Sequence, residues 1–118
     1  KRVVPRLVEQ DMGVLAFKTM AGGNFLGPDN VLQKIQVTPA ECLQYAMSLP
    51  TSVVISGMDR PEILNQNLET ARNFRPLAET EIASLLAKTA PVASAGQYEW
   101  FKGPNGLRRT QELKGTYA

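Results

Sequence analysis

The sequence predicts an α/β domain with parallel strands, and three observations support this fold class. Two short apolar runs, Val14–Phe17 and Val53–Ile55, lack polar alternation, which is typical of strands in a parallel sheet that is covered on both faces. A segment with helical periodicity lies between them, as in a βαβ unit. The length of 118 residues fits one small domain. We therefore expect a parallel strand pair joined by a crossover helix.

The first part of the chain is expected to contain a helix, a strand and a long loop. Apolar residues recur at helical spacing within residues 1–10, with no cap and no methionine before them, so we expect the chain to begin inside a helix. This helix should end near Asp11–Met12, with Gly13 in the left-handed position that closes many helices. After the strand, residues 21–36 carry the turn signal Gly27–Asn30 and are expected to form a long connecting loop.

The second helix has the clearest start in the sequence. Thr38 and Glu41 have the spacing of a capping box, and Pro39 occupies the first helical position. The helix is expected to span 38–50 and to end at Pro50, before the second strand. One of its faces is apolar and carries Cys42, Leu43, Ala46 and Met47.

Two further helices follow the second strand. Asp59 is predicted to cap a helix over 59–73, with Glu62 three residues later. A last helix is predicted over 79–92, followed by a tail over 95–118 without periodicity, so residues 1–118 form one domain made of 1–94 and the tail. The residues expected to face inward are Ile63, Leu64, Leu68 and Ala71 on the first helix, packed on the sheet, and Ile82, Leu85 and Leu86 on the second.

Composition excludes several classes of function. The 13 basic and 11 acidic side chains give a formal charge of +2, too small to predict a nucleic-acid or membrane-surface partner. No apolar stretch approaches the roughly 18 residues of a spanning helix, so no membrane role is expected. Cys42 is the only cysteine, so no disulfide can form within the chain, which fits a reducing, cytoplasmic compartment. We expect it to be a small core residue. The chain has no histidine, and we expect no complete active site on it.

The junctions that follow the two strands indicate an anion site. Gly57 leads from the second strand into a helix, and Gly22 and Gly23 follow the first strand. The first turn of a helix has unpaired amide groups and a fractional positive charge, which together favour phosphate. Two such junctions in one short chain predict a cradle for a phosphate-containing cofactor.

With these junctions, the chain resembles the C-terminal portion of an aldo/keto reductase, an NADP-dependent (β/α)8 barrel, over essentially all 118 residues. The stretch Val14–Gly23 is similar to the seventh strand of that family and its loop over the pyrophosphate. Residues 38–50 then resemble the seventh helix, 53–55 the eighth strand and 59–73 the eighth helix. Residues 79–92 resemble the extra C-terminal helix, and the tail resembles the loop that borders the substrate. The implied fold is the C-terminal part of a TIM barrel.

The resemblance implies a set of cofactor-binding residues for NADP. They fall on the loops after the seventh and eighth strands, where barrels of this kind commonly hold phosphate. Positions 63, 66 and 67 share one helix face. The resemblance assigns Lys18, Met20, Ala21 and Gly22 to the pyrophosphate, Gly57 and Asp59 to the adenosine ribose-phosphate, and Ile63, Gln66 and Asn67 to the adenine.

The sequence departs from the family at the clamp for the 2′-phosphate. Many members have lysine, serine and arginine where this chain has Gly57, Met58 and Ile63. Either Arg60 binds the 2′-phosphate from a neighbouring position, or the preference for NADP over NAD is weaker in this chain.

The resemblance assigns no catalytic residue to this chain. The family reduces an aldehyde or ketone by hydride transfer, and its catalytic tyrosine, lysine, aspartate and histidine come from the first half of the barrel. We therefore expect the isolated chain to be inactive and to need that N-terminal half as a partner.

Other interpretations stay open. A non-catalytic α/β module could bind a nucleotide, or a partner protein through its sheet edge. Without the resemblance, Gly57 is explained by a tight turn between strand and helix, and Asn67 by a position that faces solvent. Lys18 is then explained as an ordinary solvated charge. A weaker hypothesis assigns an RNA contact to the basic tail residues Lys102, Arg108, Arg109 and Lys114, for which solvated surface is the default interpretation.

Overall fold

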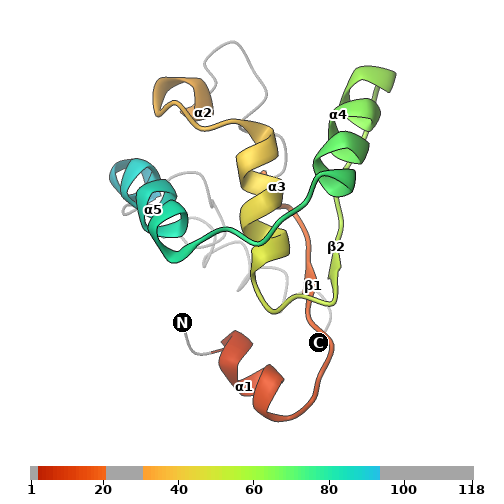
Figure 1. Ribbon diagram of the computed structural model, residues 1–118, viewed down its shortest axis with the longest axis vertical. Helices are drawn as coiled ribbons and strands as arrows, with labels where there is room; N and C mark the ends of the chain where they lie inside the picture. The colour runs from red at the N-terminus through yellow and green to blue at the C-terminus, as the bar shows by residue number, and fades with distance from the viewer. Residues whose placement is uncertain (1–2, 21–30, 94–118) are drawn as a thin grey trace, which may run out of the picture.

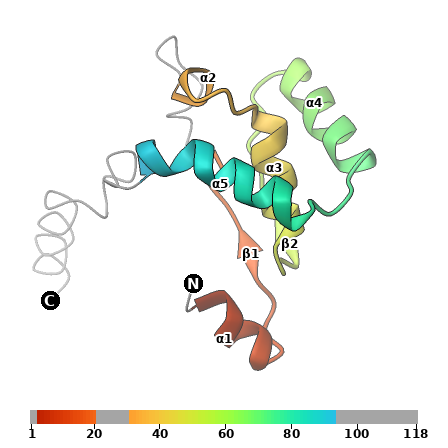
Figure 2. The ribbon, with the colours of Figure 1, turned by 60° about the vertical axis from the view of Figure 1, so that its left-hand side comes forward.

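The computed structural model describes residues 3–20 and 31–93 of the chain (Figure 1). The central helix is α3, which lies between α5 on one side and α4 on the other, with the strand pair beside it (Figures 1 and 2). The elements in chain order are α1 (Val3–Glu9), β1 (Leu15–Ala16), α2 (Val31–Lys34), α3 (Pro39–Ser48), β2 (Val53–Val54), α4 (Pro61–Arg72) and α5 (Glu79–Ala93).

The two strands pair in parallel, which confirms the α/β class predicted from the sequence. Leu15 lies opposite Val53, and Ala16 lies opposite Val54. The pairing extends beyond the strands, because the Ile55 amide donates to the Ala16 carbonyl at 2.8 Å. Within the described residues the sheet has only these two strands, so both outer edges have backbone groups that no strand pairs.

The two faces of this sheet differ in their burial. Val14 is buried, and Ala16 and Val54 are half-buried on the face toward α3, which contacts β2. The opposite face is apolar and exposed. Two large side chains from each strand segment, at every second position, lie on this face. The expectation that both faces are covered is thus wrong for the described part of the chain. The four exposed residues are Leu15, Phe17, Val53 and Ile55.

The capping box at the start of α3 is confirmed. The Glu41 amide donates to Thr38 Oγ1 at 3.1 Å, and the Thr38 amide donates to Glu41 Oε2 at 2.7 Å. At the other end Leu49 is extended, with ψ of 162°, as expected for a residue that precedes proline. Local sequence therefore determines both ends of this helix.

The closing residues of α1 and α2 differ from the predictions. Asp11, with φ of 52°, takes the left-handed position that was expected at Gly13. Its amide donates to Val8 and that of Met12 to Leu7, the paired bonds of a Schellman motif. Gln36, with φ of 54°, closes α2 in the same way. The predicted loop over 21–36 therefore contains a helix at its end, while residues 21–30 lie outside the described part.

The core lies where α2, α3 and α5 meet. Leu32, Val37 and Leu85 form its buried cluster, and half-buried side chains, including Cys42 and Tyr45, pack against it. Burial, together with the neighbouring Glu41 carboxylate, raises the pKa of the Cys42 thiol, which disfavours the reactive thiolate at neutral pH. On α5 only Leu85 is buried. Ile82 is half-buried and Leu86 is exposed, so the inward set predicted for this helix is wrong at Leu86.

Of the apolar stripe predicted for α4, only Ile63 lies on the face that the helix buries. Leu64 and Leu68 are 41% and 39% exposed, and Ala71 is exposed as well. Ile63 is half-buried as predicted, and the other half-buried positions of the helix are Gln66, Asn67 and Thr70, which recur with it at helical spacing. The helix packs beside α3 and not over the sheet, and this placement turns a largely polar face inward.

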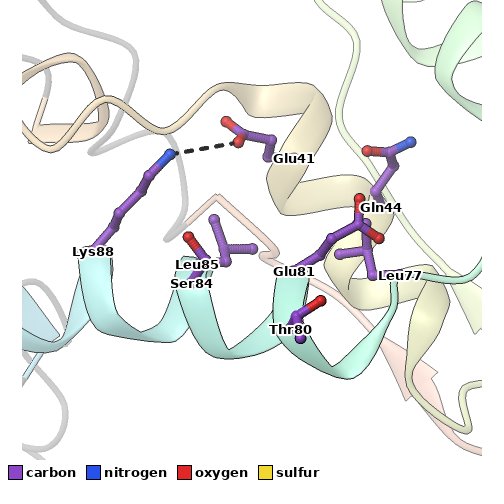
Figure 3. Close-up of a pocket in the computed structure, with 8 residues that line it drawn as sticks. All are labelled: Glu41, Gln44, Leu77, Thr80, Glu81, Ser84, Leu85 and Lys88. Atoms are coloured by element: carbon purple, nitrogen blue, oxygen red, sulfur yellow. Dashed lines mark ion pairs between the residues drawn. The ribbon is translucent and has the colours of Figure 1, made fainter.

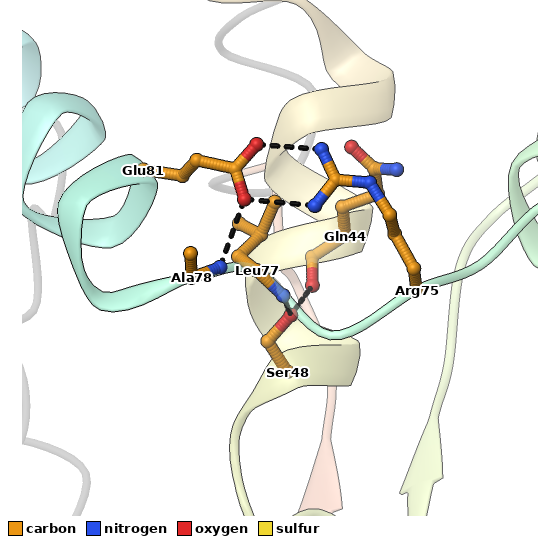
Figure 4. Close-up of polar contacts among 6 residues, drawn as sticks. All are labelled: Gln44, Ser48, Arg75, Leu77, Ala78 and Glu81. Carbon is orange, nitrogen blue, oxygen red and sulfur yellow. Dashed lines mark hydrogen bonds and ion pairs between the residues drawn. The ribbon is translucent and has the colours of Figure 1, made fainter.

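The segment that joins α4 to α5 is held against α3 by polar contacts (Figure 4). Ser48 Oγ accepts from the Leu77 amide at 3.0 Å and donates to the Gln44 carbonyl at 2.7 Å. Nearby, Arg75 reaches both carboxylate oxygens of Glu81, at 2.8 and 2.6 Å, and the Ala78 amide donates to the same carboxylate at 2.8 Å. These bonds orient the start of α5.

Stability should fall in acid through Glu81. Hydrogen bonds from Arg75 and from the Ala78 amide lower the pKa of Glu81 from 4.5 to about 2. The folded pKa lies below the unfolded one, so this contribution is full above pH 4.5 and is lost as the pH falls from there toward about 2. Urea unfolding between pH 7 and pH 2.5 should show a shallower pH dependence in both Arg75→Ala and Glu81→Gln than in the wild type. A full wild-type slope in Arg75→Ala would contradict this assignment.

Candidate functional site

A cavity of about 480 Å³ opens at the ends of the two strands. Its walls come from the segment after β1, the segment after β2, the first two turns of α4 and the start of α3. The volume falls within the usual range for small-molecule sites. The lining residues are Phe17, Lys18, Thr19, Met20, Pro39, Ile55, Ser56, Gly57, Met58, Asp59, Ile63 and Gln66.

Most of the residues predicted to bind a cofactor meet in this cavity. Asn67 does not line it but lies one helical position beyond Gln66. Ala21 and Gly22 lie outside the described residues. The predicted residues that line the cavity are Lys18, Met20, Gly57, Asp59, Ile63 and Gln66.

Lys18 marks the point where the chain leaves β1. Its φ of 56° is left-handed, a conformation that costs a non-glycine residue about 1 kcal/mol or more. The side chain is exposed, and its Nζ lies 5.8 Å from the centre of the Phe17 ring. The strained turn places a cation and an aromatic ring together at the cavity wall.

Gly57 is not required by the local backbone. Its φ lies outside the left-handed region, and a Cβ built at this position meets no described atom within 4 Å beyond its chain neighbours. The explanation that a tight turn needs a glycine here is therefore wrong for the described residues. What the missing side chain provides is open space next to the backbone in the cavity wall, as needed where a ligand approaches closely.

The N-terminus of α4 borders the cavity without a side-chain cap. Asp59 was predicted as the cap, but Pro61 occupies the first helical position and makes Arg60 the capping residue. Arg60 makes no side-chain capping hydrogen bond, and the Asp59 carboxylate bonds the Arg60 guanidinium instead, through two contacts of 3.2 Å. The first-turn amides of α4 therefore have no carboxylate or hydroxyl cap within the described part.

Two of the three amide side chains of α4, Gln66 and Asn67, have unpaired buried atoms. Asn67 Nδ2 donates to Ser56 Oγ at 3.1 Å, which ties the helix to the segment after β2. Asn67 Oδ1 and Gln66 Nε2 are buried and have no hydrogen-bond partner among the described residues. An unsatisfied buried polar atom costs about 1–3 kcal/mol, and it indicates a position at which a ligand or water completes the bonding.

Several lining residues were missed by sequence reasoning. Phe17, Ile55 and Met58 bring apolar surface, and Thr19 and Ser56 bring hydroxyl groups. Four of these lie next to a predicted site residue in the sequence, so adjacency was an available signal. Pro39 had no such signal, because only the packing of α3 against the strands brings it to the cavity.

A second cavity, of about 340 Å³, lies between α3 and α5, away from the strand ends (Figure 3). Its ionic groups are already engaged within the fold. Lys88 lies 3.9 Å from Glu41, which also closes the capping box, and Glu81 is held by Arg75. These contacts stabilise the packing of α5 and leave no free carboxylate for a ligand in this cavity.

The described residues include no cluster of three or more metal-ligating side chains. None of the helices in residues 3–20 and 31–93 is long and apolar enough to cross a membrane. Comparison of the chain with family models, curated proteins and solved structures found no match in any of the three.

Proposed function

We propose that this chain is the cofactor-binding part of an aldo/keto reductase, which reduces an aldehyde or ketone with a nicotinamide dinucleotide, NADP in most of that family. The observation that carries the proposal is the convergence of two strand ends and the start of α4 on one cavity. In parallel α/β folds, ligands bind at the carboxyl ends of the strands. The alternative is a non-catalytic α/β module that binds a nucleotide in the same cavity.

The lining suits the adenosine and phosphate portion of a dinucleotide. Gln66, which lines the cavity, has a donor, Nε2, that the described residues leave unpaired, and this donor fits an acceptor on the edge of an adenine. The Lys18 ammonium offers positive charge for the pyrophosphate, and the uncapped first turn of α4 offers amide donors. Gly57 leaves the space in which the ligand lies against the backbone.

The open sheet favours the barrel over the free-standing module. Both strand edges are unpaired within the described residues, and one sheet face is apolar and exposed. A two-stranded sheet is marginal alone, whereas in a closed barrel that face would meet the interior. The complementary first half is the partner that completes it.

The chemistry needs groups from that first half. Carbonyl reduction transfers a hydride from the dihydronicotinamide to the carbonyl carbon and a proton to its oxygen. No described residue that lines the cavity is a tyrosine or a histidine, and Tyr45 packs against the core. This chain therefore binds and orients the cofactor, and by itself it is expected to be inactive.

Enlarging Gly57 tests the proposal. Gly57→Leu should weaken binding of NADH and NADPH at least tenfold, because the new side chain occupies the space meant for the ligand. The free energy of unfolding should change by less than about 1 kcal/mol, since position 57 is exposed and a Cβ there meets no atom within 4 Å. Fluorescence titration of the dihydronicotinamide measures the binding of the two nucleotides, and urea unfolding measures the change in stability.

A matched control is Ala87→Leu, which introduces the same side chain at an exposed position of α5. This variant should bind both nucleotides like the wild type. Absence of saturable binding to the wild-type chain would count against a nucleotide site, and unchanged binding in Gly57→Leu would place the nucleotide elsewhere.

A further inference from the structure

The start of α4 carries more negative than positive side-chain charge. Asp59 lines the cavity, whereas Arg60 does not. Arg60 Nε lies 3.2 Å from Asp59 Oδ1, and Nη2 lies 3.2 Å from Oδ2, so the guanidinium is engaged by both oxygens of one carboxylate. Glu62 follows in the first turn of the helix.

These contacts decide which charge faces a ligand at this end of the cavity. The hydrogen bond and charge of Arg60 lower the pKa of Asp59, so its carboxylate is ionised at neutral pH. Arg60 lies among two carboxylates, and both Asp59 and Glu62 raise its pKa. The helix terminus adds only about half a positive charge. The sum is slightly negative, which does not suit a dianionic phosphate.

A ribose with a free 2′-hydroxyl needs a hydrogen-bond acceptor in place of a positive charge. The hydroxyl is a hydrogen-bond donor, and an acidic side chain near the end of a strand can accept from it, whereas a 2′-phosphate needs a free arginine or lysine. Gly57 and Met58, which precede Asp59 on the cavity wall, supply no charge. Lys18 is the one cation among the described lining residues, and it belongs to the segment after β1, on the other wall.

We infer that Asp59 makes this site select the dinucleotide with a free 2′-hydroxyl, NAD(H) over NADP(H), by presenting its carboxylate to the ribose and by holding Arg60 away from it. The inference rests on the proposed function. It assigns to Asp59 the role of a specificity residue. Arg60 could bind a 2′-phosphate only after its ion pair with Asp59 had broken.

Titration of the chain with NADH and with NADPH tests the inference. The wild type should bind NADH about tenfold more tightly than NADPH, and Asp59→Asn should bring the two dissociation constants within about threefold by strengthening NADPH binding. Asp59 makes no capping bond to α4, so the variant should fold like the wild type. Glu62→Gln removes a neighbouring carboxylate that does not line the cavity and should shift the ratio less.

The outcomes separate the two proposals. Equal or tighter binding of NADPH by the wild type, or an unchanged ratio in Asp59→Asn, overturns the role of Asp59 and leaves the nucleotide site standing. Tighter NADPH binding that is lost in Arg60→Gln would show that Arg60 leaves Asp59 for the phosphate. No saturable binding of either nucleotide overturns both the specificity and the proposed function.

Discussion

Leu85→Ala is expected to lower the free energy of unfolding by about 3 kcal/mol. Leu85 is 8% exposed and forms the buried cluster with Leu32 and Val37, so it joins α5 to the segment that precedes α3. Truncation removes apolar contacts and leaves a cavity that the surrounding helices fill only in part. Small domains have only about 5–15 kcal/mol of stability, so the loss is a large share.

The adjacent residue provides the control. Leu86 is 49% exposed, and Leu86→Ala should change the free energy of unfolding by less than about 1 kcal/mol. Both variants remove the same atoms from neighbouring positions of one helix, so helix propensity cancels in the comparison. Urea unfolding measured side by side gives the difference. Equal losses in the two variants would mean that α5 packs in another rotation.

Gln66→Met is expected to raise the stability of the chain while it weakens nucleotide binding. Methionine has nearly the shape of glutamine but no amide, so the substitution removes the unpaired buried Nε2 and its cost, a gain of about 1 kcal/mol. The same change removes the donor that we assign to the adenine, and the affinity for NADH should fall about tenfold. Effects of opposite sign are typical of a polar group that serves a ligand and not the fold.

Gln33→Met is the matched control for this variant. Gln33 is exposed on α2 and does not line the cavity, so the substitution should change the free energy of unfolding by less than about 0.5 kcal/mol and the affinity by less than about twofold. Calorimetric or urea unfolding gives the stability, and fluorescence titration gives the affinity. If Gln66→Met destabilised the chain, the glutamine would have a structural partner, and its assignment to the ligand would lose its basis.

Local patterns predicted the elements well where the signal lay within a few residues. The capping box of Thr38 and Glu41 is such a case, because both partners lie in one turn. The strand pair is another, since continuous apolar runs around a helical segment leave few arrangements other than a parallel crossover. The end of α1 was displaced to Asp11 because several residues near a helix end can adopt the left-handed conformation, and a glycine is not the only choice.

Hydrophobic periodicity did not predict which face of α4 is buried. Periodicity favoured the face with Leu64 and Leu68, because burial of apolar side chains is usually what drives a helix to pack on its neighbours. The Asn67 to Ser56 bond and the packing beside α3 turn the face with Gln66 inward. The resemblance had assigned Gln66 and Asn67 to a ligand but gave no reason for their burial.

The sequence by itself determined which segments form the two strands and the helices α1, α3, α4 and α5, because these depend on neighbours within a few positions. The parallel direction of the strands followed from the helical segment that lies between the two apolar runs. The tertiary structure decided that Lys18, Gly57 and Gln66 share one cavity, that Arg60 pairs with Asp59 and does not line it, and that one sheet face stays open. Such relations depend on how α3 packs against its neighbours. That packing is a sum of many weak contacts between residues distant in the chain, and no local pattern records it.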